Sequence, residues 1–186
     1  MSRGHLVVIS APSGAGKTTI CRQLQAAHPD WQFSVSATTR PRREHETDGK
    51  DYIFLSEEEF DRYLAAGELI EWESIYGHRY GTLRSILIKA LKAGQALLLD
   101  VDVKGGVNVK AQFPEDTTAI FIDPPDMEIL IQRLKERGTE NPATLEKRLA
   151  RIPEEMPYKK EYDHVVVNDD LDRAVKEIES IIMEVK

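Results

Sequence analysis

The segment APSGAGKT at residues 11–18 constrains the fold of this chain more than any other feature. It follows an apolar, strand-like run at residues 6–10 and precedes a helix-like run in which Ile20, Leu24 and Ala27 share one face. A strand, a glycine-rich turn, Lys-Thr and a helix are the parts of a phosphate-binding P-loop. Glycines let backbone N–H groups turn toward a phosphate, and the helix adds the positive end of its dipole. The segment therefore predicts binding of a nucleoside triphosphate.

Two side chains of this segment carry the expected chemistry. Lys17 supplies a cation for the β- and γ-phosphates, and the Thr18 hydroxyl can ligate Mg²⁺. Ala11 departs from the strict pattern, which opens with glycine, but Gly14 and Gly16 are retained. The alternative interpretation is a plain strand–turn–helix corner that binds no ligand.

Length and composition indicate one α/β domain with a cytoplasmic location. The 186 residues suit a single domain with small insertions, and the longest apolar runs are too short to cross a membrane. Cys21 is the only cysteine, so an intrachain disulfide is impossible. We expect Cys21 to be a packed core residue rather than a nucleophile.

The charge pattern favours a small anionic ligand over nucleic acid. The net charge is −7, yet Arg40, Arg42 and Arg43 lie within four residues. A nucleic-acid-binding protein usually has a basic surface, whereas local cations in an acidic chain suit a small phosphorylated ligand. A solvated charged loop is the alternative interpretation of the three arginines.

The remaining pattern alternates strands and helices. Buried parallel strands are expected at residues 5–10, 95–100, 117–123 and 163–168. Amphipathic helices are expected at residues 82–93, 126–137 and 171–185. Such alternation predicts a parallel sheet that is covered by helices on both faces.

Two segments break this alternation. Residues 33–80 contain expected strands at 51–55 and 69–72, separated by a helix that Ser56 and Glu59 would cap. Residues 137–158 are turn-rich and then contain an expected helix at 144–152, which Pro153 should end or kink. The first segment predicts a strand-rich insertion. The second predicts an arginine-bearing flap, with a plain surface loop as the alternative.

A second set of motifs resembles the nucleoside monophosphate site of guanylate kinases. It begins with SATTRPRR at residues 36–43, Glu46, and DGKDY at 48–52. The further matches are IEW at 70–72, YGT at 80–82, LDVD at 99–102, RGTE at 137–140, KRL at 147–149 and VVVNDD at 165–170. The resemblance spans residues 5–183.

The resemblance implies a three-layer α/β P-loop kinase fold with a parallel sheet, a strand-rich GMP-binding insertion and a small lid. The core is expected at residues 1–32, 81–125 and 159–186. The insertion is expected at 33–80, and the lid with its flanking helices at 126–158. The three parts would form one continuous unit.

The resemblance also implies an activity in purine nucleotide metabolism: Mg²⁺-dependent phosphoryl transfer from ATP, the co-substrate, to GMP and dGMP. The implied ATP contacts are Ala11, Pro12, Ser13, Gly14, Ala15, Gly16, Lys17, Thr18, Thr19, Asn168, which would contact adenine, and Asp169. The implied GMP contacts are Ser36, Arg40, Arg43, Tyr52, Glu71, Tyr80, Thr82 and Asp102. The implied catalytic residues are Lys17, Arg43, Arg137 and Arg148, and the implied metal site is Thr18 with Asp100 acting through water.

The residue types agree with a GMP ligand. Arg40 and Arg43 present forked guanidinium donors to a phosphate dianion. Guanine offers N1–H and exocyclic N2 donors, which a carboxylate such as Glu71 can accept, beside an O6 acceptor that the Thr82 hydroxyl can serve.

Three carboxylates have ordinary alternatives. Alternation along the expected strand puts Ile70 and Trp72 on one face and Glu71 on the other, where a solvent-facing glutamate would look the same. Asp100 and Asp102 end a parallel strand beside the P-loop, where a Mg²⁺-assisting acid belongs. Two turn-forming acids at a strand end would also fit.

Some positions depart from the family pattern. The family usually has proline at Arg42, Pro-Gly at residues 44–45, glutamine at Lys104 and an alanine-rich helix at 151–158. Two rival functions remain at this stage: a guanylate-kinase-like module that binds proteins without catalysis, and a related P-loop kinase with another phosphorylated acceptor. The sequence leaves open whether the chain is a monomer or a homo-oligomer.

Overall fold

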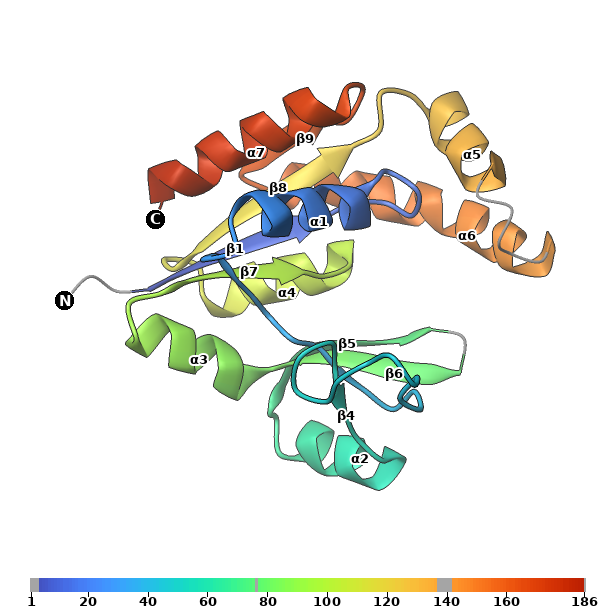
Figure 1. Ribbon diagram of the computed structural model, residues 1–186. Helices are drawn as coiled ribbons and strands as arrows, with labels where there is room; N and C mark the ends of the chain where they lie inside the picture. Colours follow the sequence, from blue (N-terminus) through green and yellow to red (C-terminus); the bar gives the residue numbers. More distant parts are fainter. Residues whose placement is uncertain (1–3, 76, 137–141, 186) are drawn as a thin grey trace.

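A five-stranded parallel sheet forms the centre of the computed structural model, which describes residues 4–75, 77–136 and 142–185 (Figure 1). In spatial order, its strands are β2 (Gln32–Phe33), β7 (Ala96–Asp100), β1 (His5–Ser10), β8 (Thr117–Asp123) and β9 (His164–Val167). Both β1 and β8 have the bounds that the apolar runs predict. The expected α/β fold with a parallel central sheet is confirmed.

Helices cover both faces of this sheet. The helices α1 (Lys17–Ala27) and α7 (Leu171–Val185) lie on one face, and α3 (Arg84–Lys92) and α4 (Val103–Gln112) lie on the other (Figure 1). Alternate residues of the three central strands, β7, β1 and β8, divide between two buried clusters. One contains Val7 with Leu24 and Ile178, and the other contains Val8 with Leu87. The core therefore follows the three-layer arrangement.

A second, four-stranded sheet lies below the P-loop edge of the core (Figure 1). Its strands, in spatial order, are β4 (Ile53–Phe54), β3 (Ala37–Thr38), β6 (His78–Leu83) and β5 (Leu69–Ile75). The helix α2 (Glu57–Ala65) precedes β5, and Ser56 and Glu59 form the predicted capping box. The chain from 37 to 83 thus contains the expected strand-rich structure.

Several predicted element bounds in this region are wrong. The strand expected at 51–55 is limited to Ile53 and Phe54, whereas the strand expected at 69–72 continues to Ile75. The helix expected from Thr82 begins only at Arg84, because Thr82 and Leu83 pair with β5. Pairing with a distant strand outweighs the local helical periodicity at these two residues.

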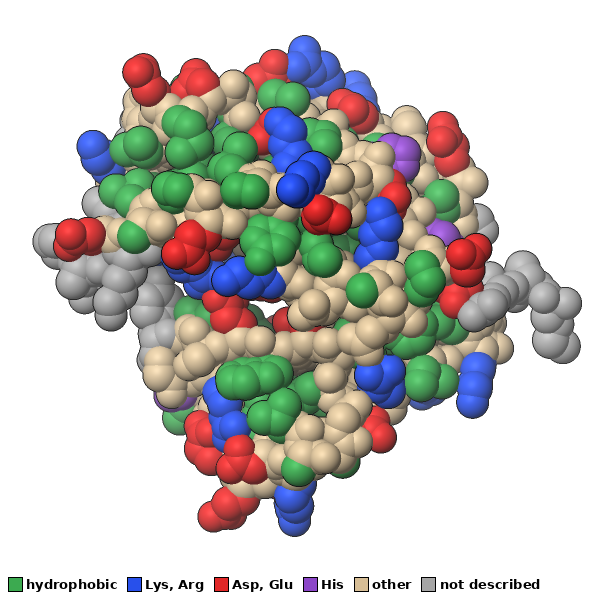
Figure 2. Space-filling model, turned by 180° about the vertical axis from the view of Figure 1, so that it is seen from behind, with side chains coloured by type: hydrophobic (Ala, Val, Ile, Leu, Met, Phe, Trp, Pro, Cys, Tyr) green, Lys and Arg blue, Asp and Glu red, His purple; other side chains and the backbone are tan. Residues whose placement is uncertain are grey.

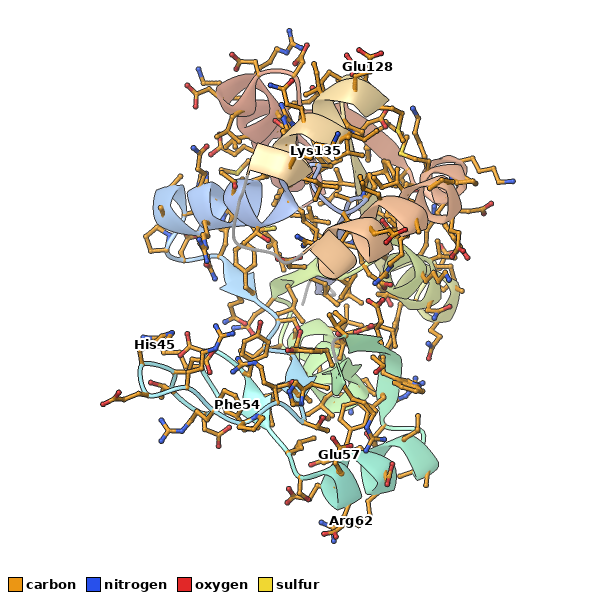
Figure 3. All side chains as sticks on the ribbon, turned by 90° about the vertical axis from the view of Figure 1, so that its right-hand side faces the viewer. His45, Phe54, Glu57, Arg62, Glu128 and Lys135 are labelled. Atoms are coloured by element: carbon orange, nitrogen blue, oxygen red, sulfur yellow. The ribbon has the colours of Figure 1, made fainter. Side chains whose placement is uncertain are left out.

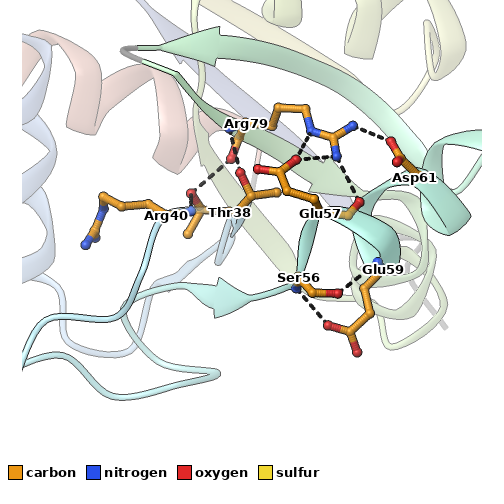
Figure 4. A network of polar contacts seen from close by, with 8 residues as sticks. Thr38, Arg40, Ser56, Glu57, Glu59, Asp61 and Arg79 are labelled. Atoms are coloured by element: carbon orange, nitrogen blue, oxygen red, sulfur yellow. Dashed lines mark hydrogen bonds and ion pairs between the residues drawn. The ribbon is translucent and has the colours of Figure 1, made fainter.

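Arg79 of β6 ties α2 to the second sheet (Figure 4). Its Nε lies 2.8 Å from Glu57 Oε2, and its Nη1 lies 2.6 Å from Asp61 Oδ1. The guanidinium also stacks over the ring of buried Phe60, 4.5 Å from the ring centroid. The Arg79 carbonyl accepts a 2.9 Å hydrogen bond from Thr38 Oγ1, which joins β6 to β3. This network holds the second sheet and its helix together.

The last part of the chain carries α5 (Met127–Glu136), α6 (Pro142–Glu155) and the 3₁₀ helix η1 (Met156–Glu161). Pro153 should end or kink the expected helix, and the first of these is wrong: α6 continues through Pro153 to Glu155. Ile152 is 1% exposed and packs into the core, and this burial offsets the missing Pro153 N–H. Arg137 lies outside the described residues. No helix in the described ranges is long and apolar enough to cross a bilayer.

Removing the core contact of α7 should destabilise the whole sheet. Ile178 is fully buried between α7 and the sheet, so Ile178→Ala should lower the free energy of unfolding by roughly 2–5 kcal/mol. Glu177→Ala, at an exposed position of the same helix, should change it by less than about 0.5 kcal/mol. Urea denaturation followed by circular dichroism measures both. Equal effects of the two variants would contradict this description of the core.

Candidate functional site

The P-loop joins β1 to α1 at the carboxyl edge of the parallel sheet. Gly14 and Gly16 adopt φ values of +94° and +99°, a region that side chains disfavour. Gly16 is the N-cap of α1 and offers no side-chain cap, so the first-turn N–H groups depend on another acceptor. This geometry suits a bound anion at the start of α1.

The loop is supported from behind by Asn168, which follows β9. Asn168 is 4% exposed, and its Nδ2 donates a 2.7 Å hydrogen bond to the Ala15 carbonyl. A Cβ on Gly16 would overlap the same Asn168 amide, so the glycine permits this close approach. Asn168 also borders a cavity of about 480 Å³ together with Thr19, Arg133 and other residues. Its side chain thus both holds the loop and borders this cavity.

Lys17 forms an ion pair with the carboxylate that ends β7. Its Nζ lies 2.6 Å from Asp100 Oδ1 and 2.7 Å from the Val101 carbonyl oxygen. Cys21 lies beneath this pair, is 5% exposed, and has its thiol pKa raised by burial, which agrees with a packed core residue. Asp100 and Thr18 both line a cavity of about 700 Å³, so a hydroxyl and a carboxylate oxygen face the same space.

The same 700 Å³ cavity gathers the expected GMP-phosphate ligands. Its lining includes Ser36, Arg40, Arg43, Tyr52 and Tyr80. These residues come from β6 and from the chain around β3 and before β4. Five separate hydrogen-bonding side chains therefore converge on one polar space beside the P-loop.

Glu46 positions the two arginines of this cavity. Its carboxylate accepts hydrogen bonds from Arg40 Nη2 at 2.6 Å and from the Arg43 backbone N–H at 2.8 Å. Hydrogen bonding to Arg40, with that from Arg43, lowers the pKa of Glu46 to about 2. The Arg40 guanidinium also lies 5.3 Å from the ring centroid of Tyr52. The sequence motif includes Glu46, but its role depends on contacts that spacing does not reveal.

Glu71 lies in the interior of the site, not on the solvent-facing side of a strand. The Thr82 hydroxyl donates a 2.5 Å hydrogen bond to Glu71 Oε1, and burial raises the pKa of this carboxyl to about 7. A bulge between Leu69 and Glu71 interrupts the strand register. Ile70 packs into the core while Trp72 contacts Phe60 and is 45% exposed. The expected simple alternation is therefore wrong.

Asp102 lies near Glu71, at the N-cap of α4. Its Oδ1 accepts a 2.7 Å hydrogen bond from the Gly105 N–H. A Cβ on Gly105 would lie 2.8 Å from Asp102 Oδ1 and 3.0 Å from Glu71, so this glycine lets both carboxylates pack on α4. Asp100, in contrast, pairs with Lys17. The two acids thus have different partners, and their expected roles toward metal and guanine stay predictions.

The third side of the site is formed by α6. Arg148 and Arg151 line a cavity of about 470 Å³ together with the P-loop, Glu73 and Asp102. Arg148 was expected here, whereas Arg151 was not assigned a role. The sequence signal that could have identified Arg151 is its position three residues after Arg148 on an expected helix, because residues at this spacing share a helix face.

The surface shows how these parts meet. Between the core and the second sheet, the face seen in Figure 2 is hollowed, and acidic and basic side chains border the hollow. Figure 3 shows His45 and Phe54 in the part of the molecule that holds the second sheet, and Lys135 of α5 in the part that holds the central sheet. Among the described residues, no cluster of three or more His, Cys, Asp or Glu side chains forms a ready-made metal site.

Comparisons with known proteins identify the family of the chain. A family model described as guanylate kinase matches residues 3–185. The chain belongs to the guanylate kinase family. It is 49% identical over 181 residues to a guanylate kinase of Symbiobacterium thermophilum, covering 97% of this chain and 85% of the relative. It is 52% identical over 174 residues to that of Salinibacter ruber, covering 93% and 92%.

A solved structure supports the fold of this guanylate kinase family member. The crystal structure of guanylate kinase from Anaplasma phagocytophilum superposes with a TM-score of 0.76 at 33% sequence identity, covering 98% of this chain and 86% of that one. The chain is thus an enzyme of this family, as the sequence motifs indicated.

The buried carboxyl of Glu71 should lower stability at neutral pH. Its folded-state pKa is raised to about 7 from an ordinary 4.5, so the native state binds the proton more tightly than the unfolded state. Stability should therefore fall as the pH rises between these values, by about 3 kcal/mol for this group. Glu71→Gln retains an acceptor for Thr82 and removes the charge.

Urea denaturation of both proteins near pH 5 and near pH 8 isolates this effect, because other titrating groups cancel in the difference. The stability advantage of Glu71→Gln should be larger near pH 8. Glu68→Gln, a change at a partly buried position just before β5, is the control and should show no such pH dependence. If Glu71→Gln changed the free energy of unfolding by the same amount at both pH values, the Glu71 carboxyl would not have a raised pKa in the folded state.

Proposed function

We propose that this chain transfers the γ-phosphoryl group of ATP to GMP and dGMP, giving ADP and GDP or dGDP in purine nucleotide metabolism. One observation supports this most strongly. The cavity of about 470 Å³ over the P-loop and the cavity of about 700 Å³ lined by Arg40 and Arg43 share Thr18 at the start of α1. Two phosphate-binding spaces that meet at one residue suit a donor and an acceptor phosphate held close together.

Selection of guanine over other bases follows from the hydrogen-bonding groups of Glu71 and Thr82. Its carboxylate accepts hydrogen bonds from guanine N1–H and N2, and the Thr82 hydroxyl can turn from Glu71 to O6. Adenine presents an acceptor at N1 and lacks the N2 donors, so it leaves the buried carboxylate without partners. Asp102, at the N-cap of α4, supplies a second acceptor on this side.

Phosphoryl transfer then depends on alignment and charge neutralisation. The GMP phosphate is already a nucleophile, so no strong general base is required. Lys17 exchanges its contact with Asp100 for the β- and γ-phosphates of ATP. Arg43 approaches the transferring group from the acceptor side, and Arg148, with Arg137, approaches from the lid side.

The oxygen donors near the P-loop fit Mg²⁺. Thr18 and Asp100 line the same cavity, and a hydroxyl with a single carboxylate suits a small cation that keeps several waters. When bound, Mg²⁺ neutralises phosphate charge. Thr18 would hold it directly and Asp100 through water. In this proposal Asn168 and Asp169 border the adenine pocket, and residues 33–80 and 126–158 act as the GMP-binding insertion and the lid of a cytoplasmic enzyme.

A substrate screen tests this function. ATP with Mg²⁺ should support turnover of GMP and dGMP, and turnover of AMP, UMP or CMP should be lower by orders of magnitude. Glu71→Gln places an amide opposite the guanine donors, so kcat/KM for GMP should fall on the order of 100-fold while the ATP KM changes little. Coupled detection of ADP formation measures both quantities.

Glu68→Gln should retain the activity of the original enzyme and serves as the matched control. Absence of turnover with every nucleoside monophosphate would favour a non-catalytic binding module. A preference for AMP, UMP or CMP would favour another acceptor. Equal weakening of GMP and ATP use by Glu71→Gln would show that Glu71 only supports the fold.

A further inference from the structure

A carboxylate from α6 contacts the backbone of the P-loop. Glu155 Oε2 accepts a 2.9 Å hydrogen bond from the Ser13 N–H, although the two residues are 142 positions apart. The Glu155 side chain is only 7% exposed. The proposed reaction assigns no role to this residue, yet it occupies a donor of the phosphate-binding loop.

The position of α6 makes this contact a lasting one. Ile152 is 1% exposed and belongs to the same buried cluster as Ala11 and Ala15 of the P-loop segment. A helix fixed by core packing beside the loop cannot easily withdraw Glu155, which lies one turn further along. Glu155 therefore acts as a fixed support for the loop and not as a stand-in that an incoming phosphate displaces.

Arg151 orients this carboxylate and balances its charge. Its Nε lies 3.1 Å from Glu155 Oε1, so Glu155 uses one oxygen for Arg151 and the other for Ser13. Without such a partner, a buried anion beside the P-loop would repel a triphosphate. The pair thus gives the loop a fixed acceptor at little electrostatic cost to nucleotide binding.

The other end of the Arg151 guanidinium reaches the second sheet. It pairs with Glu73 of β5 and lies 3.9 Å from Asp102 Oδ2. Burial and the nearby Asp102 raise the pKa of Glu73, and Arg151 opposes this shift. One cation therefore links the support of the P-loop to carboxylates beside the guanine-binding side of the site.

We propose that Glu155 is a positioning residue that fixes the Ser13 end of the P-loop, and that Arg151 orients Glu155 and connects it to β5. That the two nucleotides are ATP and GMP rests on the proposed function. Because Glu155 acts on the loop that receives ATP, its removal affects ATP more than GMP. Arg151 contacts both sides of the site, so its removal affects both substrates.

Four variants test this proposal. Glu155→Ala removes the acceptor of Ser13, Glu155→Gln keeps an oxygen acceptor but loses the charge, and Arg151→Ala removes the link. Glu154→Ala, at the exposed neighbouring position, is the matched control. Dissociation constants for ADP with Mg²⁺ are measured by calorimetry, and the KM values for ATP and GMP by steady-state kinetics.

Glu155→Ala should weaken ADP binding about tenfold and raise the ATP KM more than the GMP KM. Glu155→Gln should recover part of this loss, and Arg151→Ala should raise both KM values. Combining Arg151→Ala with Glu155→Ala in one protein should give ADP binding about equal to that of Glu155→Ala alone, because both residues act through one chain of contacts. Glu154→Ala should behave like the original protein.

Three results of the binding measurements would overturn the proposal: ADP binding by Glu155→Ala that is unchanged, ADP binding that is tighter, or effects of Arg151→Ala and Glu155→Ala that multiply. Tighter binding would mean that Glu155 competes with phosphate. Amide exchange of Ser13 gives a direct reading in the native protein and in Arg151→Ala, should Glu155→Ala fail to fold. Ser13 should be protected in the native protein and less protected in Arg151→Ala, and equal protection would also overturn the proposal.

This experiment separates the two proposals. ADP binding is measured without GMP, so weaker ADP binding by Glu155→Ala supports the positioning role even if GMP proves not to be the acceptor. Normal turnover of GMP with no effect of Glu155→Ala or Arg151→Ala on ADP would leave the proposed function intact and refute the positioning role.

Discussion

The shape of the P-loop is the constraint on which the rest of this site depends. Its backbone must expose N–H groups at the start of α1, and a short glycine-rich turn cannot hold that shape by itself. Asn168 supports it through the Ala15 carbonyl, and Glu155 supports it through the Ser13 N–H. Both supports come from the C-terminal part of the chain, so the phosphate site forms only when β9 and α6 are in place.

The second sheet carries a buried carboxyl group that lowers the stability of the free protein near neutral pH. Glu71 is placed in a largely buried position by the bulge in β5, by its hydrogen bond from Thr82 and by the absence of a side chain at Gly105 of α4. Burial raises the pKa of its carboxyl to about 7, so the charged form is disfavoured in the empty site. In the proposed function, donors on a guanine base would relieve that cost, so the same residue would be unfavourable for the free protein and useful for recognition.

Much of the fold could be predicted because its signals are local. The apolar runs of β1 and β8, the glycines of the P-loop and the capping box at Ser56 each depend on a few neighbouring residues. The errors occur where distant pairing decides the structure. Thr82 fits a helical pattern but pairs with Glu71 of β5, and the bulge there follows from the register of that pair.

The functional site likewise combines residues that local motifs indicate with residues that only a distant contact brings in. The positions of Lys17 and Arg43 at the cavities beside the P-loop agree with the motifs, whereas the support by Glu155 depends on a contact across 142 positions. The most direct test of the account is a crystal structure with GMP and ADP bound. Guanine N1 and N2 should lie about 2.6–3.2 Å from the Glu71 carboxylate, with the GMP phosphate against Arg43. A guanine base that does not contact Glu71 would contradict the account.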